Sequence, residues 1–184
     1  PLSLEELIDV YKEQINYMVS AGVDLLVVET MMSLAECRTA LIAAKEVCDL
    51  PVLVTLTFEA NGRTLFRTDA KTAAIVMESL GAAAVGVNCS TGPLKMADII
   101  TEMAGVCSIP IIAKPNAGIP RLNEAGETVY DNTPENFANN PISFNVLSVT
   151  LKPVIFLSFP SKTPVILGNG IHSSLEISIS SINL

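Results

Sequence analysis

The chain has 184 residues, of which 49% are hydrophobic, and a formal net charge of −8 at pH 7. This composition excludes a disordered chain and supplies enough apolar side chains for a sizeable core. The acidic balance argues against a nucleic-acid partner, because surfaces that bind phosphate backbones need clustered lysine and arginine.

Membrane insertion and secretion are likewise not expected. The sequence has no run of about 18 apolar residues, and its N-terminus lacks the basic and apolar regions of a signal peptide. Its four cysteines are widely separated and form no Cys-x-x-Cys pair, which favours free thiols over a disulfide framework. We therefore predict a cytoplasmic protein with no membrane contact.

The first part of the chain alternates between helix and strand patterns. Apolar residues at helical spacing predict a first helix over residues 4–19. A short apolar run at residues 25–28 predicts a buried strand that stops at Glu29. Ser33 is then placed to cap a second helix over residues 34–47.

The alternation continues through the next 70 residues or so. The further strands and helices are predicted, in chain order, at residues 52–58, 70–80, 82–88, 93–104 and 109–113. The strand at 82–88 ends abruptly in Asn88 and Cys89, and turn residues follow. In barrels of parallel strands, side chains at the C-terminal ends of the strands face the active site. Cys89 is therefore the first candidate for a functional residue.

The spacing of the strands indicates the architecture. Their ends, at Glu29, Phe58, Cys89 and Asn116, are 29, 31 and 27 residues apart. This is close to the roughly 30 residues per unit of a (β/α)8 barrel of about 250 residues. The pattern predicts an α/β fold with about four β-α units of parallel sheet. A doubly wound open sheet shows the same alternation, so the spacing alone leaves both architectures open.

Residues 141–184 have a different composition. They contain no Ala, against 18 in the first 140 residues, and nine of the chain's 15 Ser. Residues 154–159 and 164–167 have strand propensity, but no helical pattern separates them. We interpret this segment as an irregular or β-prone tail unrelated to the preceding fold. A shifted reading frame would account for it, and a genuine β-rich extension is the alternative.

Four stretches together resemble the homocysteine S-methyltransferase family in order and spacing: Val27-Val28-Glu29-Thr30, Asn61-Gly62-Arg63-Thr64, Gly86–Pro93 and Lys114–Pro120. The last of these, with Tyr130-Asp131, is most similar to the N-terminal homocysteine-binding barrel of the bacterial cobalamin-dependent methionine synthases. The resemblance covers residues 2 to about 138. It implies that residues 1–140 are the central part of a homocysteine-binding TIM barrel domain.

The resemblance also implies a chemistry, the zinc-dependent methylation of homocysteine to methionine. Cys89 would be one of three cysteine ligands of Zn2+, and the homocysteine sulfur would take the fourth position as a thiolate. Glu29 would hold the substrate amino group, and Asn88 would shape the site beside the metal. The methyl donor would be methylcobalamin on another module of a larger parent enzyme, which also carries a folate module.

Other features depart from the family. Its Gly-Gly-Cys-Cys motif is absent, and Cys37, Cys48 and Cys107 are predicted in the second helix or before a strand, away from the site. The chain also begins in what would be the helix before the fourth barrel strand. We therefore expect a fragment that is inactive alone, because it lacks two of three zinc ligands. Its open strand edges favour self-association.

Alternatives remain for the residues and for the function. Cys89 could be a buried structural thiol, Glu29 could form an ion pair with Lys114, and Asn116 could serve only a turn. A different TIM-barrel enzyme, such as an aldolase, fits the alternation, but no glycine-rich phosphate loop follows Lys114. The remaining alternative is an inert truncated fragment.

Overall fold

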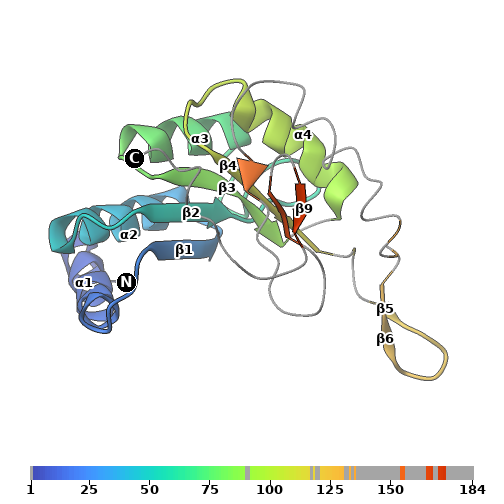
Figure 1. Ribbon diagram of the computed structural model, residues 1–184, viewed down its shortest axis with the longest axis horizontal. Helices are drawn as coiled ribbons and strands as arrows, with labels where there is room; N and C mark the ends of the chain where they lie inside the picture. Colours follow the sequence, from blue (N-terminus) through green and yellow to red (C-terminus); the bar gives the residue numbers. More distant parts are fainter. Residues whose placement is uncertain are drawn as a thin grey trace.

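The computed structural model describes residues 2–89, 92–116, 118, 121–130, 133 and 135, and the backbone of residues 154–155, 165–167 and 170–172. Helices and strands alternate along its first part (Figure 1). In chain order they are α1 (Leu4–Ser20), β1 (Leu26–Met31), α2 (Leu34–Val47), β2 (Val52–Leu56), α3 (Ala70–Ser79), β3 (Ala84–Cys89), α4 (Pro93–Ala104) and β4 (Ile111–Pro115). The predicted α/β alternation is thereby confirmed.

Several predicted strand boundaries are wrong by one to three residues, among them the end of β2, which is Leu56 rather than residue 58, and the start of β3, which is Ala84 rather than residue 82. The first strand does not stop at Glu29 but continues to Met31, because Met31 still pairs with Leu56 of β2 after an irregularity in the register. The last strand of the alternation begins at Ile111 rather than two residues earlier. Pro110 precedes it and has no N–H to donate, although its carbonyl accepts from Val85 at 3.1 Å.

The sheet topology distinguishes the two architectures that the spacing left open. Strands β1, β2, β3 and β4 are parallel and lie in sequential order. A doubly wound sheet reverses its strand order at a switch point, whereas a barrel adds each strand beside the previous one. The observed order is that of a partial TIM barrel.

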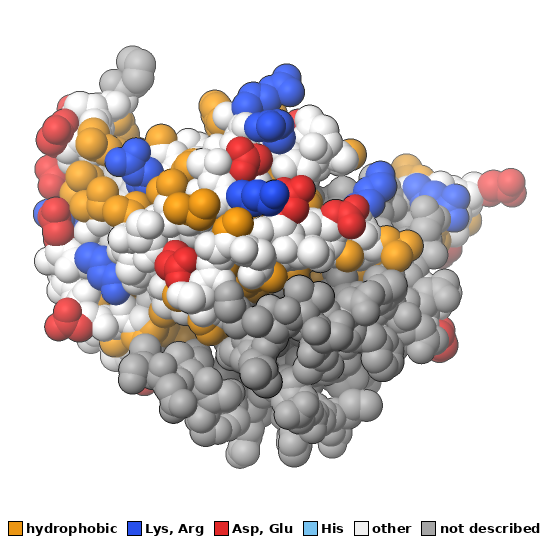
Figure 2. Space-filling view, turned by 90° about the horizontal axis from the view of Figure 1, so that it is seen from above, with side chains coloured by type: hydrophobic (Ala, Val, Ile, Leu, Met, Phe, Trp, Pro, Cys, Tyr) orange, Lys and Arg blue, Asp and Glu red, His pale blue; other side chains and the backbone are white. Residues whose placement is uncertain are grey.

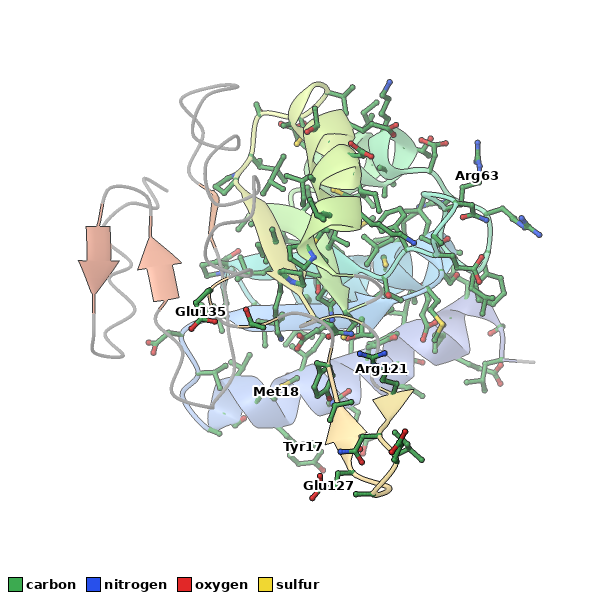
Figure 3. All side chains as sticks on the ribbon, turned by 90° about the vertical axis from the view of Figure 1, so that its right-hand side faces the viewer. Tyr17, Met18, Arg63, Arg121, Glu127 and Glu135 are labelled. Carbon is green, nitrogen blue, oxygen red and sulfur yellow. The ribbon has the colours of Figure 1, made fainter. Side chains whose placement is uncertain are left out.

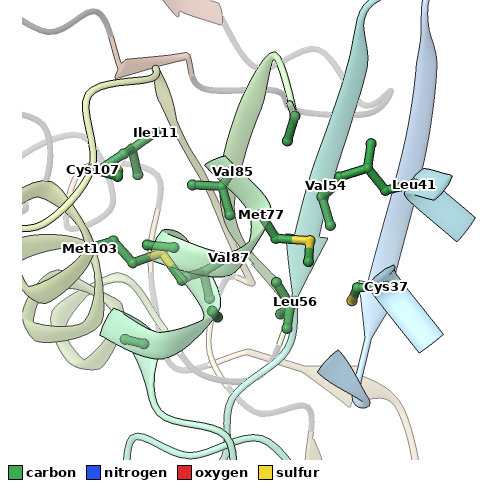
Figure 4. Packing of buried hydrophobic residues seen from close by; sticks show 14 of the residues in the cluster. Cys37, Leu41, Val54, Leu56, Met77, Val85, Val87, Met103, Cys107 and Ile111 are labelled. Atoms are coloured by element: carbon green, nitrogen blue, oxygen red, sulfur yellow. The ribbon is translucent and has the colours of Figure 1, made fainter. Parts of the chain in front are cut away.

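The core supports the same assignment. One cluster joins buried residues of all four helices to alternate strand residues, including Val54, Leu56, Val85, Val87 and Ile111 (Figure 4). The intervening strand residues Leu53, Ala84 and Ile112 form a separate cluster without helical members. All four helices therefore cover one face of the sheet, as in a barrel wall. We call the other side the helix-free face.

Gly86 permits the close approach of β3 and β4. It lies within β3, and a Cβ atom built on it would be 2.0 Å from the carbonyl oxygen of Ile112 in β4. Such a distance is well inside van der Waals contact, so a side chain would push the two strands apart. A glycine inside a strand commonly marks a place where another backbone approaches closely.

Side-chain caps fix the starts of three helices. Ser3 and Glu6 form a reciprocal capping box at α1, and Ser33 accepts from the N–H of Glu36 at α2. At α3, Asp69 accepts from the N–H of Thr72 at 2.9 Å. This bond is the main reason why the pKa of Asp69 is lowered from its ordinary value of 3.8.

A short hairpin projects from the body (Figures 1 and 3). It consists of β5 (Arg121–Leu122) and β6 (Thr128–Val129), which are antiparallel. Charged side chains of both signs are interspersed over the visible part of the surface in Figure 2. Among the helices of the described ranges, none has the length and apolarity needed to cross a bilayer.

The predicted tail lies largely outside the described residues. Three short strands within it have a described backbone, β7 (Val154–Ile155), β8 (Val165–Leu167) and β9 (Gly170–His172). The first is parallel to β4 and the other two follow in antiparallel order. Two of them fall within the runs of predicted strand propensity. The interpretation of residues 141–184 as a non-family tail stays a prediction.

Candidate functional site

The predicted site residues lie at the C-terminal ends of β1 and β3. Glu29 belongs to β1, and Asn88 and Cys89 end β3, with β2 between the two strands. Asn88 and Cys89 are in register with Lys114 and Pro115 of β4. Because parallel strands all end at the same edge of a sheet, these residues share one edge.

Four polar residues also share the helix-free face. Alternation along the strands places Glu29, Thr55, Asn88 and Lys114 opposite the face whose side chains pack against the helices. These residues come from β1, β2, β3 and β4 in turn. The concave side of a barrel wall therefore carries a polar side chain near the C-terminal part of each of these strands.

Asn88 joins the ends of β1 and β3. It is fully buried, and its Oδ1 accepts a hydrogen bond from the N–H of Thr30 at 3.1 Å. Its Nδ2 donates to Thr30 Oγ1 at 2.6 Å and to Cys89 Sγ at 3.2 Å. One side-chain amide thus connects the residue after Glu29 to the candidate metal ligand across the end of β2.

The backbone at both strand ends is in a conformation that such residues rarely adopt. Thr30 has φ +61° and Cys89 has φ +57°, both in the left-handed region. For a β-branched residue such as Thr30 this is an uncommon geometry, and each such residue costs on the order of 1–3 kcal/mol. The two hydrogen bonds between Thr30 and the Asn88 side chain, one donated by each residue, help to hold Thr30 in this conformation. Strained backbone of this kind is concentrated at functional sites.

Glu29 forms an ion pair with Lys114. The contact joins Oε1 of Glu29 to Nζ of Lys114, and the two side chains are 38% and 22% exposed. The ion pair that the sequence offered as an alternative role for Glu29 is therefore present, although β1 and β4 are not neighbours in the sheet. A pair this exposed contributes no more than about 1 kcal/mol of stability.

Thr55 presents a buried hydroxyl on the same face. The residue is 2% exposed and pairs in register with Gly86. Its Oγ1 has no hydrogen-bond partner in the part of the chain that the structure describes. A buried polar atom without a partner costs about 1–3 kcal/mol, which makes Thr55 a second point of local destabilisation near the site.

The other cysteines are elsewhere, as predicted. Cys37 is buried in α2, and burial is the largest of the causes that raise its pKa to about 12. Cys48 is the C-cap of α2 rather than a residue within the helix, and Cys107 is buried after α4. Neither position is at the C-terminal ends of the strands.

A zinc ion at a catalytic site needs three protein ligands. Within the described ranges, no group of three His, Cys, Asp or Glu side chains is suited to hold a metal ion. Cys89 has a suitable thiol, but the described residues do not by themselves fit a zinc ion.

Parts of the motifs that carried the family resemblance lie outside the described residues, namely Ser90, Thr91, Ala117, Ile119, Pro120 and Asp131. The Asn61–Thr64 stretch is described and forms a loop after β2. Arg63 donates to the carbonyl of Arg67 at 2.9 Å and lies 3.9 Å from Asp69 (Figure 3). The side chain of Arg63 therefore stabilises the loop between β2 and α3 through these two contacts.

Thr30 and Thr55 belong to the candidate site, although the sequence pattern predicts no role there for either residue. The signal for Thr55 was available, because a threonine interrupts an apolar strand, Val52–Leu56, that is buried throughout. The left-handed conformation of Thr30 could not be predicted from its residue type, because β-branched residues rarely adopt a positive φ.

Comparisons with known proteins identify the family and the fold of the chain. Two methionine synthases, from Mycobacterium leprae and Mycobacterium tuberculosis, are 31% and 30% identical to the chain over 123 residues. The match covers 64% of this chain and 10% of each synthase, so the chain spans about a tenth of the length of these relatives.

A solved structure, the apo form of the homocysteine methyltransferase MmuM from Escherichia coli, has a similar fold, with a TM-score of 0.57 and 18% sequence identity. The likeness covers 64% of this chain and 45% of that chain. The family model for homocysteine S-methyltransferase matches residues 1–151. The resemblance predicted from the sequence is thus confirmed, and the chain belongs to the homocysteine S-methyltransferase family.

Proposed function

We propose that the chain forms part of a homocysteine-binding site for methyl transfer to sulfur, with methionine as the product. The observation that carries the proposal is the Asn88 amide, which ties Cys89 to the backbone beside Glu29. A carboxylate suited to an ammonium group and a thiol suited to a soft metal are thereby held at one edge of the sheet. Family membership supports the same reading.

Each residue has a distinct role in this proposal. Glu29 accepts hydrogen bonds from the α-ammonium group of homocysteine. Asn88 is a positioning residue, because it holds both Thr30 and Cys89. Cys89 would supply one thiolate for Zn2+ once two further cysteine ligands, which this chain lacks, are provided by another segment. Since the described residues do not complete that site, we propose that the chain is inactive alone.

The overall reaction transfers a methyl group as CH3+. A bond forms between the methyl carbon and the homocysteine sulfur, and the bond from that carbon to the donor breaks. The electron pair of the broken bond stays with the donor, and the thiol loses its proton. We propose methylcobalamin as the donor, held on another module of a larger enzyme that also has a folate module. This part rests on the likeness to methionine synthases.

A titration with L-homocysteine tests the binding part of the proposal. NMR spectra of the 15N-labelled chain under reducing conditions should show shifts at the amides of Thr30, Asn88 and Cys89. Glu29→Gln should weaken binding at least tenfold, because it removes the charge that pairs with the ammonium group. Glu13→Gln, on the exposed surface of α1, is the matched control. Absence of shifts in the wild-type chain at millimolar ligand would refute the proposal.

Metal analysis after exhaustive desalting tests the role of Cys89. We expect little zinc in the chain alone, and near-stoichiometric zinc when a segment with the two missing cysteines is supplied. Cys89→Ala should abolish that gain, whereas Cys48→Ala should preserve it. Near-stoichiometric zinc in the unsupplemented chain, lost in Cys89→Ala, would show that the chain assembles a full site without added ligands.

A further inference from the structure

The ion pair between Glu29 and Lys114 has a property that the proposed function does not use. It places a carboxylate and an ammonium group side by side at the edge of the sheet where Cys89 lies. An α-amino acid carries the complementary pair, an ammonium and a carboxylate on one carbon. We propose that Lys114 is a specificity-determining residue that binds the α-carboxylate of the amino-acid thiol, an inference that rests on the proposed function.

The register brings the three recognition groups within reach of one small molecule. Lys114 aligns with Asn88, and the next residue, Pro115, aligns with Cys89. Neighbouring strands lie about 4.8 Å apart, which is within the length of an extended four-carbon amino acid. A ligand with its sulfur toward Cys89 therefore has its zwitterionic end within reach of the Glu29–Lys114 pair.

The exposure of the pair suits exchange with a ligand. Both side chains are partly exposed, at 38% for Glu29 and 22% for Lys114, so the pair is reached from solvent. Lys114 contacts Oε1 of Glu29, and an ionised carboxylate has about four lone-pair sites on its two oxygens, so it can accept from a second donor. A bound zwitterion can thus add its ammonium to Glu29 and its carboxylate to Lys114. Glu29 would then contact the ligand ammonium as well as Lys114, and Lys114 would contact the ligand carboxylate as well as Glu29.

Lys114 also offsets the electrostatic repulsion between Glu29 and the carboxylate of an amino-acid ligand. A site built on Glu29 alone would attract the ammonium group but repel the carboxylate attached to the same carbon. The chain as a whole carries a net charge of −8, which adds to that repulsion. A lysine beside Glu29 offsets both effects. The pair therefore favours an amino acid over a simple amine.

Three thiols that differ in one group test this inference. They are L-homocysteine, 3-aminopropane-1-thiol, which lacks the carboxylate, and 4-sulfanylbutanoate, which lacks the amino group. Lys114→Met should weaken L-homocysteine and 4-sulfanylbutanoate at least tenfold while leaving 3-aminopropane-1-thiol no weaker than for the wild type. Lys114→Arg should restore most of the lost affinity, because it retains the positive charge.

Controls separate this inference from the proposed function and from misfolding. Lys45→Met, in the last turn of α2 at the opposite end of the strands, should change none of the three affinities. Equal weakening of all three thiols by Lys114→Met would assign Lys114 a purely structural role and overturn the inference. An unchanged affinity for L-homocysteine would overturn it as well. If the wild-type chain binds none of the thiols, the proposed function fails and this inference falls with it.

Discussion

The side chain of Asn88 bonds to both the backbone N–H and the hydroxyl of Thr30, although β2 lies between their strands. A buried amide that satisfies a residue two strands away constrains the curvature of the sheet at that edge. It also supports a left-handed residue whose conformation is otherwise unfavourable. The shape of the candidate site therefore depends on this contact.

Replacing Asn88 should destabilise the fold as well as the site. Asn88→Ala removes the partner of the Thr30 N–H, and we expect a loss of about 3 kcal/mol in the free energy of unfolding. Urea denaturation followed by circular dichroism measures this loss. Asn16→Ala, which removes an exposed bond to the Lys12 carbonyl, should change stability by no more than about 0.5 kcal/mol. Equal effects of the two variants would contradict the structural role of Asn88.

Gly86 should not tolerate a side chain. In Gly86→Ala the new methyl group would meet the Ile112 carbonyl oxygen at 2.0 Å, so β3 and β4 must separate. We expect a loss of about 3 kcal/mol or more, since overpacking of a core commonly costs 1–3 kcal/mol.

Gly105→Ala is the matched control for Gly86→Ala. Gly105 has φ −71°, and its added Cβ would find its nearest atoms at 3.6 Å. We expect a gain of about 0.4–1 kcal/mol, because alanine restricts the unfolded chain at a compatible position. Thermal denaturation of the two variants should therefore move the melting temperature in opposite directions.

Thr55→Val should raise stability. The hydroxyl of Thr55 has no partner in the described part of the chain, so its replacement by a methyl group removes a desolvation cost of about 1 kcal/mol. Thr39 is equally buried at 2% exposed, but its hydroxyl donates to the Ala35 carbonyl at 2.9 Å. Thr39→Val should therefore be neutral or destabilising in the same urea titration. A loss of stability in Thr55→Val would indicate that this hydroxyl is satisfied in solution.

The cap of α3 should make stability depend on acidic pH. The pKa of Asp69 is lowered in the fold, chiefly by the hydrogen bond from Thr72, so the unfolded chain binds the proton more readily. Its contribution is complete above the ordinary value of 3.8 and is lost as pH falls through the lowered pKa.

Two variants of Asp69 isolate this effect. Asp69→Ala should cost about 1 kcal/mol at pH 7 and less below pH 4. Asp69→Asn keeps a capping side chain without a titrating group, so its stability relative to the wild type should improve as pH falls below 4. Stability curves measured between pH 2 and 7 check both expectations. A cost of Asp69→Ala that is the same at both extremes would refute the assignment.

Much of the fold was predictable because it is encoded locally. Ser33 and Asp69 each cap a helix within three residues, and apolar runs mark the strands without reference to distant parts of the chain. Strand boundaries were less predictable. The extension of β1 to Met31 depends on pairing with Leu56, which no local pattern encodes.

The site was predictable only in part, for the same reason. The end of an apolar strand indicates Asn88 and Cys89, and opposite charges at two strand ends favour a Glu29–Lys114 ion pair. The hydrogen bond from the Thr30 N–H to Asn88 Oδ1 joins residues 58 positions apart, and its geometry depends on the curvature of the assembled sheet. Whether Glu29, Asn88 and Cys89 bind substrate and metal stays a prediction.

The long sequence separation of these contacts has a consequence for the order of folding. Neighbouring β-α units close short loops, whereas the Glu29–Lys114 contact spans 85 residues. Closing long loops is slow and entropically unfavourable until local structure has formed. The polar edge of the sheet should therefore assemble after the four units and dissolve first when either outer strand detaches. Any ligand bound there would report on the integrity of the whole four-strand wall.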